Sequence, residues 1–128
     1  MAATRVFFAT DTHGSTVCFR KFINAGKFYE AQVLIMGGDI IGKIAVPIIQ
    51  VSAGRYRATL QGSIESIESE EALKALLDRI GMLGWYAKVM TEEEFREISA
   101  DRAKVDALFH RLARQRLESW IELSETRL

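Results

Sequence analysis

The stretches 6–14 and 33–42, which read VFFATDTHG and VLIMGGDIIG, decide the fold predicted for this chain. Each opens with four apolar residues and then changes to a loop that contains glycine and an acidic residue. Apolar runs without alternation are typical of strands buried on both faces, as in a parallel sheet. The sequence therefore predicts two such strands, at residues 5–10 and 32–36, each ending in a polar loop.

The segment between these strands favours a helix. Ser15 or Thr16 is a suitable N-cap, and Gly26 is placed to end the helix. The positions expected to face the core are Val17, Cys18, Phe22 and Ile23. A strand, helix, strand unit is almost always right-handed and brings both strand ends to the same rim of the sheet. The predicted fold class is therefore α/β.

Asp11, His13 and Asp39 follow the two strands almost directly. In open α/β sheets the ligand crevice lies outside the carboxyl ends of the strands, so these three side chains are expected to converge. Carboxylate and imidazole groups are common ligands of divalent metals, whereas the core of a sheet has no structural use for them. The sequence predicts a metal site formed by these three residues.

The same residues resemble a known family. The Asp-x-His-Gly element at 11–14 and the Gly-Gly-Asp-x-x-Gly element at 37–42 are similar to the first two signature blocks of the calcineurin-like metallophosphoesterases. The resemblance implies the N-terminal half of an αββα sandwich and hydrolysis of phosphate mono- or diesters at two divalent cations. It assigns Asp11 and His13 to the first cation and Asp39 to the bridge between both. Manganese or iron is expected, and zinc is also compatible with these ligands.

The later blocks of that family are Gly-Asn-His-Asp/Glu, a further His and Gly-His-x-His, and the sequence contains none of them. The resemblance therefore implies that the chain corresponds to the N-terminal part of such an enzyme. On this reading the 128 residues alone do not complete the active site, and no residue is assigned as the proton donor. The expected partners are a phosphate ester and either further copies of the chain or a missing C-terminal half.

The rest of the chain is expected to extend one domain, 1–128. In residues 46–62, apolar and polar residues alternate on both sides of Ala53-Gly54, and this pattern predicts a β-hairpin. Pro47 near its start favours an edge strand. This hairpin and the strand, helix, strand core make up residues 1–62. Residues 63–128 are expected to be mainly helical. The expected elements there are a helix through Gly81, an extended piece at 85–89, a short helix from Thr91 to Ser99, and a long helix capped by Asp101.

Charge and composition narrow the choice of partners. The 17 basic residues are matched by 17 acidic ones and are interleaved with them, so no nucleic-acid footprint is indicated. Apolar runs are too short to cross a membrane. A single cysteine and the lack of a signal-like N-terminus favour the cytoplasm.

Two alternatives to an enzyme stay open at this point. The first is an interaction module that kept the strand, helix, strand rim but lost catalysis and now associates with itself or a partner. The second is a flavodoxin-like nucleotide-binding domain, in which Asp11 and Asp39 hold one magnesium ion. The second alternative lacks support, because the sequence contains no phosphate-binding, glycine-rich loop that runs directly into a helix.

Overall fold

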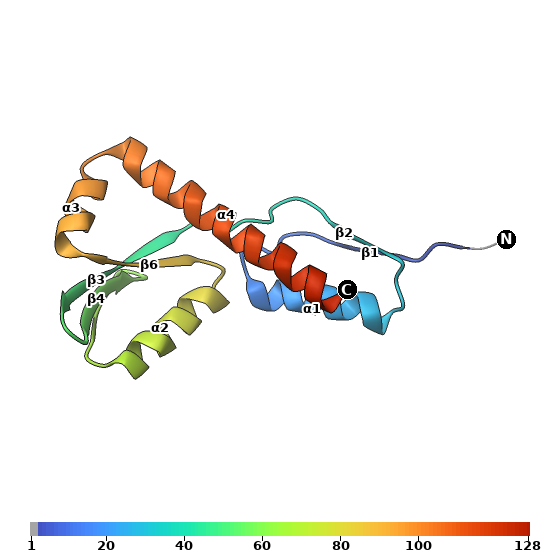
Figure 1. Ribbon diagram of the computed structural model, residues 1–128, viewed down its shortest axis with the longest axis horizontal. Coiled ribbons are helices and arrows are strands. Elements are labelled where there is room, and N and C mark those ends of the chain that lie inside the picture. Colours follow the sequence, from blue (N-terminus) through green and yellow to red (C-terminus); the bar gives the residue numbers. More distant parts are fainter. Residues whose placement is uncertain (1–2) are drawn as a thin grey trace.

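Strands β1 (Val6–Ala9) and β2 (Val33–Met36) pair in parallel, and helix α1 (Thr16–Phe28) connects them. The computed structural model describes residues 3–128 and is a mixed α/β structure. The side-chain oxygen of Ser15 accepts from the amide of Cys18 and caps α1, as predicted. The α/β class and the strand, helix, strand unit are therefore confirmed (Figure 1).

A second, four-stranded sheet has the order β5-β4-β3-β6. Its strands are β3 (Ala45–Ser52), β4 (Arg55–Leu60), β5 (Ser63–Ile67) and β6 (Tyr86–Thr91). The predicted hairpin is β3–β4, and Gly54 in its turn has a φ of 74°. β6, the extended piece expected at 85–89, pairs in parallel with β3. β5 was not predicted, so the segment 63–128 contributes two strands as well as helices.

The position of Pro47 differs from the prediction. β3 has neighbours on both sides, so the edge strand expected from Pro47 was wrong. The register gives Pro47 a partner in β6, Lys88, while the pairs with β4 begin only at Ile48. Pro47 therefore lies just outside the ladder with β4, where its missing N–H costs no bond to that strand.

Three further helices follow, and each begins at a capping side chain. They are α2 (Glu70–Met82) after Ser69, α3 (Glu92–Ser99) after Thr91, and α4 (Arg102–Arg127) after Asp101. Thr91 and Glu94 form the predicted capping box, in which each side chain accepts a backbone N–H of the other residue. Among the described residues, no helix combines the length and apolar character needed to cross a bilayer.

Two predictions for α1 were wrong. The helix continues past Gly26 to Phe28, because Gly26 serves close packing and not termination: a Cβ there would lie 2.5 Å from a methyl group of Leu34. Val17 and Cys18 are exposed, whereas Phe19 takes the buried position between them and Phe22. The apolar residues at the start of this helix therefore do not all belong to its core face.

Helix α4 packs against both sheets, whereas α1, α2 and α3 each cover only one of them. α2 packs on one face of the four-stranded sheet, while α3 and the first half of α4 lie against the other face. The second half of α4 reaches α1, where the ring of Trp120 stacks on Phe19 at 4.6 Å between centroids. As Figure 1 shows, α4 runs along the molecule from the larger sheet to the β1–β2 unit and connects both parts.

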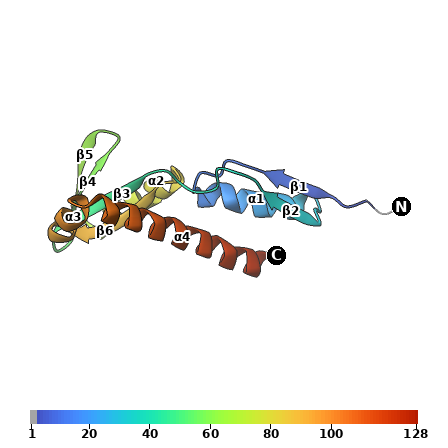
Figure 2. The same ribbon diagram turned by 90° about the horizontal axis from the view of Figure 1, so that it is seen from above.

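One face of the β1–β2 sheet is uncovered in the described chain. α1 and α4 lie against the other face (Figure 2). The residues of the uncovered face and their exposed fractions are Val6 50%, Phe8 61%, Val33 41% and Ile35 44%. The expectation that these strands are buried on both faces was therefore wrong for this chain. We call these four residues the open face.

Candidate metal centre

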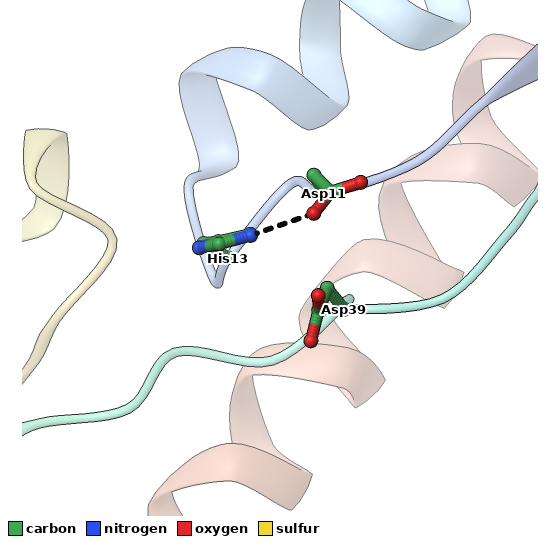
Figure 3. Close-up of side chains that lie close together, drawn as sticks. All are labelled: Asp11, His13 and Asp39. Atoms are coloured by element: carbon green, nitrogen blue, oxygen red, sulfur yellow. Dashed lines mark hydrogen bonds and ion pairs between the residues drawn. The ribbon is translucent and has the colours of Figure 1, made fainter.

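Asp11, His13 and Asp39 lie together at the ends of β1 and β2, as Figure 3 shows. One potential ligand atom of each residue lies within 4.8 Å of those of the other two. Nε2 of His13 lies 3.1 Å from Oδ1 of Asp11. All three predicted residues are thus brought to one place, and no second group of this kind occurs in residues 3–128.

The two loops that carry these residues are held together by their backbones. The bonds run from the amides of Asp11, His13 and Gly14 to the carbonyls of Gly38, Asp39 and Ile40, with N–O distances of 3.0, 3.0 and 2.7 Å. They extend the contact between β1 and β2 beyond the ends of the strands. The hydroxyl of Thr12 is buried and donates a further bond to the Ile40 carbonyl. The relative position of the two loops is therefore fixed by main-chain bonds.

The three candidate ligands share an unusual backbone conformation. Asp11, His13 and Asp39 have positive φ values of 61°, 48° and 54°. Only five non-glycine residues of the described chain adopt such values, and the other two are elsewhere, so the left-handed conformation concentrates at this site. Left-handed backbone is unfavourable for residues with a Cβ and gathers at functional sites, where surrounding structure maintains it.

The arrangement fits one divalent cation. With metal–ligand bonds of about 2.1 Å, ligand atoms on adjacent corners of an octahedron are about 3 Å apart and those on opposite corners about 4.2 Å. The Asp11–His13 separation of 3.1 Å matches adjacent corners. The ligand atom of Asp39 lies within 4.8 Å of the other two, and its side chain is exposed and can therefore rotate toward the same cation. Two carboxylates and one imidazole form a suitable donor set for manganese, iron or zinc.

Asp11 is held in its charged form. The hydrogen bonds of Thr10 and of His13, in that order, are the largest causes that lower the pKa of this carboxyl below its usual 3.8. The charge of His13 adds to this lowering, while partial burial opposes it. A lowered pKa keeps a ligand carboxylate ionised, and protons compete less with a metal for it.

The lowered pKa leads to a prediction on acid stability. A carboxyl whose pKa is lower in the folded state stabilises the fold above its unfolded pKa, and this stabilisation is lost as pH falls through the folded value. We expect Thr10→Val to raise the pKa of Asp11 toward 3.8 and to shrink the stability gained between acid and neutral pH. NMR titration of the Asp11 carboxyl carbon measures the first effect, and urea unfolding at several pH values the second. An Asp11 pKa that is the same in both proteins would contradict this role of Thr10.

A third loop, between α2 and β6, contacts the two loops at 10–14 and 37–42 that carry the candidate ligands and that we call the metal loops for this reason. Gly14, Gly42 and Gly84 meet there: a Cβ on Gly42 would lie 2.1 Å from the carbonyl oxygen of Gly84, and one on Gly84 would lie 2.1 Å from that of His13. Gly14 and Gly84 also have positive φ, of 77° and 78°. Where the three loops touch, glycine is thus required by space at all three positions and by backbone conformation at Gly14 and Gly84.

Two side chains complete this support. The hydroxyl of Tyr86 accepts a bond of 2.7 Å from the amide of Gly42. The guanidinium of Arg116 lies over the Tyr86 ring, 4.9 Å from its centroid, and donates to the carbonyl oxygens of Gly14 and Trp85. Burial lowers the pKa of Arg116 without removing its charge. Sequence reasoning missed Gly84, Tyr86 and Arg116, because no local pattern links residues up to 102 positions apart.

Comparison of the chain with protein-family models, with curated proteins and with solved structures finds no match. The function of the chain is therefore inferred from the residues and geometry of the site.

Proposed function

We propose that this chain contributes a metal site for phosphoester hydrolysis. The observation that carries the proposal is the convergence of Asp11, His13 and Asp39, each in a left-handed conformation, at the ends of two parallel strands. Strained backbone at three residues that all bear metal-binding groups is better explained by ligand orientation than by packing, since the three side chains are exposed.

The residues present have separate roles in this proposal. Asp11 and His13 would bind one cation, and Asp39 would bind the same cation and bridge to a second. A bound divalent cation supplies Lewis acidity toward phosphoryl oxygens and makes a coordinated water more acidic. The hydrogen bond of Thr10 lowers the pKa of Asp11, and the main-chain hydrogen bonds hold together the two loops that carry the carboxylates. Manganese or iron is proposed as the metal.

Three ligands leave most coordination positions of a cation free. We propose that the chain forms half of a two-sheet metallophosphoesterase-type sandwich, in which the other half packs on the open face and supplies the remaining ligands. The support for this arrangement is that the strands of the open face, β1 and β2, are the strands that lead into the metal loops. Full hydrolytic activity is therefore proposed only for the completed sandwich.

The enzymatic proposal is tested by hydrolysis of bis(p-nitrophenyl) phosphate with added Mn²⁺. We expect slow, Mn²⁺-dependent release of p-nitrophenol that Asp39→Asn abolishes. Release at an equal rate from wild type and Asp39→Asn would show that another site is responsible.

A second candidate function, a non-catalytic interaction module, is favoured by the open face. Val6, Phe8, Val33 and Ile35 form a contiguous apolar surface on adjacent strands, and such surfaces mark sites of association. A two-stranded sheet also has two free edges that accept further strands. In this reading the chain associates with further copies of itself through β1 and β2.

Self-association gives a prediction that is independent of any metal. We expect sedimentation velocity to show a dimer or larger species whose population rises with protein concentration. Replacing Phe8 and Ile35 of the open face with serine is expected to yield a monomer, because the association would lose its apolar contact. Met82→Ser is the matched control, since Met82 is 70% exposed but lies at the end of α2. A wild-type monomer at high concentration would exclude this interaction.

A further inference from the structure

A second concave site lies on the face of the four-stranded sheet that α3 and α4 cover. A cavity of about 570 Å³ opens between β3, β6, α3 and α4. The ribbons of β3, β6 and α3 lie at the left of Figure 1. Most of its lining is apolar, with contributions from Pro47, Met90, Phe95, Val105 and Phe109. Mostly apolar cavities of roughly 300–1,000 Å³ are typical of sites for small molecules. The size and lining of this cavity therefore suit a small ligand with an apolar body.

Lys88 is an unusual member of this lining. Its neighbours Ala87 and Val89 pack on the α2 side of the sheet, so the alternation of β6 turns Lys88 toward α3 and α4. The residues that share its face, Tyr86 and Met90, are buried. Lys88 itself is only half-buried and has no carboxylate partner within residues 3–128. A cation on the core-facing side of a strand is rare unless something anionic compensates it.

A second cation, Lys43, lines the same cavity and is likewise without an ion-pair partner in the described part of the chain. The two other charged residues of the lining neutralise each other, since Arg102 lies 3.6 Å from Asp106. The cavity thus has an apolar interior and two uncompensated positive charges. Its charge is complementary to that of an anion.

We propose that this cavity binds a small amphipathic anion, of the class of medium-chain carboxylates. The apolar chain lies between the sheet and the helices, and the anionic head lies at Lys43 and Lys88. None of Asp11, His13 and Asp39 lines the cavity, so the proposal goes beyond the metal site and stands without it.

The first test compares three ligands with the same alkyl chain and different heads, using the full chain and isothermal titration calorimetry. Decanoate is expected to bind at one site and to raise Tm. Decanol is expected to bind about tenfold more weakly, because its uncharged head cannot form a charge-assisted hydrogen bond between a lysine and an anion. Decyltrimethylammonium is expected not to bind. Equal binding of the anion and the cation would overturn the proposal.

Substitutions of residues that line the cavity test where the anion binds. Lys43→Gln and Lys88→Gln are each expected to weaken decanoate binding about three- to tenfold and to leave decanol binding unchanged. Lys74→Gln on α2 is the matched control and is expected to have no effect. Val105→Trp, at a 40% exposed position of the lining, is expected to fill the cavity and weaken both ligands while circular dichroism shows an intact fold.

Two results would contradict this location. Loss of decanoate binding in Phe8→Ser would place the ligand on the open face instead of in the cavity. Unchanged decanoate affinity in Lys88→Gln and Lys43→Gln would mean that the lysines do not recognise the anion. In that case the charge on β6 would serve to discourage pairing at the free edge of the sheet.

Discussion

Asp39→Asn is expected to abolish the stabilisation of this protein by Mn²⁺. A ligand that binds only the folded state stabilises it by RT ln(1 + [L]/Kd), and at a hundredfold excess over Kd this raises Tm by about 10 °C for a chain of this length. Asparagine keeps the size of the side chain and tolerates left-handed backbone, so the loop is retained while the charge is lost. We expect Kd for Mn²⁺ to rise at least about 100-fold, as measured by thermal unfolding and calorimetry.

Measuring the stability of Asp39→Asn with and without Mn²⁺ distinguishes a metal ligand from a residue that only stabilises the fold. Without added metal, Asp39→Asn is expected to be no less stable than wild type, because Asp11 and Asp39 are like charges whose oxygens lie within the 4.8 Å cluster. Asp78→Asn on α2 is the matched control and should retain the full response to Mn²⁺. Equal Mn²⁺-induced shifts in Asp39→Asn and wild type would remove Asp39 from the proposed site.

Gly84→Ala is expected to be the most destabilising single-methyl change at the loop junction. The new Cβ would lie 2.1 Å from the carbonyl oxygen of His13, and the residue would keep a φ of 78°. Strained backbone costs about 1–3 kcal/mol and overpacking a similar amount, so the free energy of unfolding should fall by about 2–5 kcal/mol. Because the clash is with the metal loop itself, Mn²⁺ affinity should fall as well.

Two other glycines serve as controls, because they separate the effect of a steric clash on the free energy of unfolding from the effect of backbone strain. Gly54 has a φ of 74°, but a Cβ added there would have no atom of residues 3–128 within 4 Å beyond its chain neighbours, so Gly54→Ala should cost only about 1 kcal/mol from backbone strain. Gly81 lies inside α2 with open space around it, and Gly81→Ala should be neutral or stabilising by about 0.5–1 kcal/mol. Urea unfolding of the three variants gives the comparison. Similar losses in Gly84→Ala and Gly54→Ala would contradict a steric role for the junction.

The local parts of the fold were predictable because their causes are local. The caps at Ser15, Thr91 and Asp101, and the glycine turn of the hairpin, each depend on residues within a few positions. The candidate site was also predictable, since one βαβ unit brings 11, 13 and 39 to the same rim without help from the rest of the chain.

The remaining features depend on contacts between distant segments. β5 has only two apolar residues, and Ile64 is 73% exposed, so its alternation is too weak to predict a strand without its partner β4. The role of Gly26 depends on Leu34, which packs against it from β2. The support of the metal loops by Arg116 joins residues 102 positions apart. None of these partners is visible in a local pattern of sequence.

The convergence of three ligands on one cation is tested most directly by paramagnetic broadening in the amide NMR spectrum of the ¹⁵N-labelled chain. Substoichiometric Mn²⁺ is expected to remove the signals of Asp11, His13 and Asp39 first, and in Asp39→Asn this effect should disappear. Broadening centred on another acidic segment, such as Glu92–Glu94 at the start of α3, with the signals of residues 11, 13 and 39 intact, would contradict the proposed metal centre.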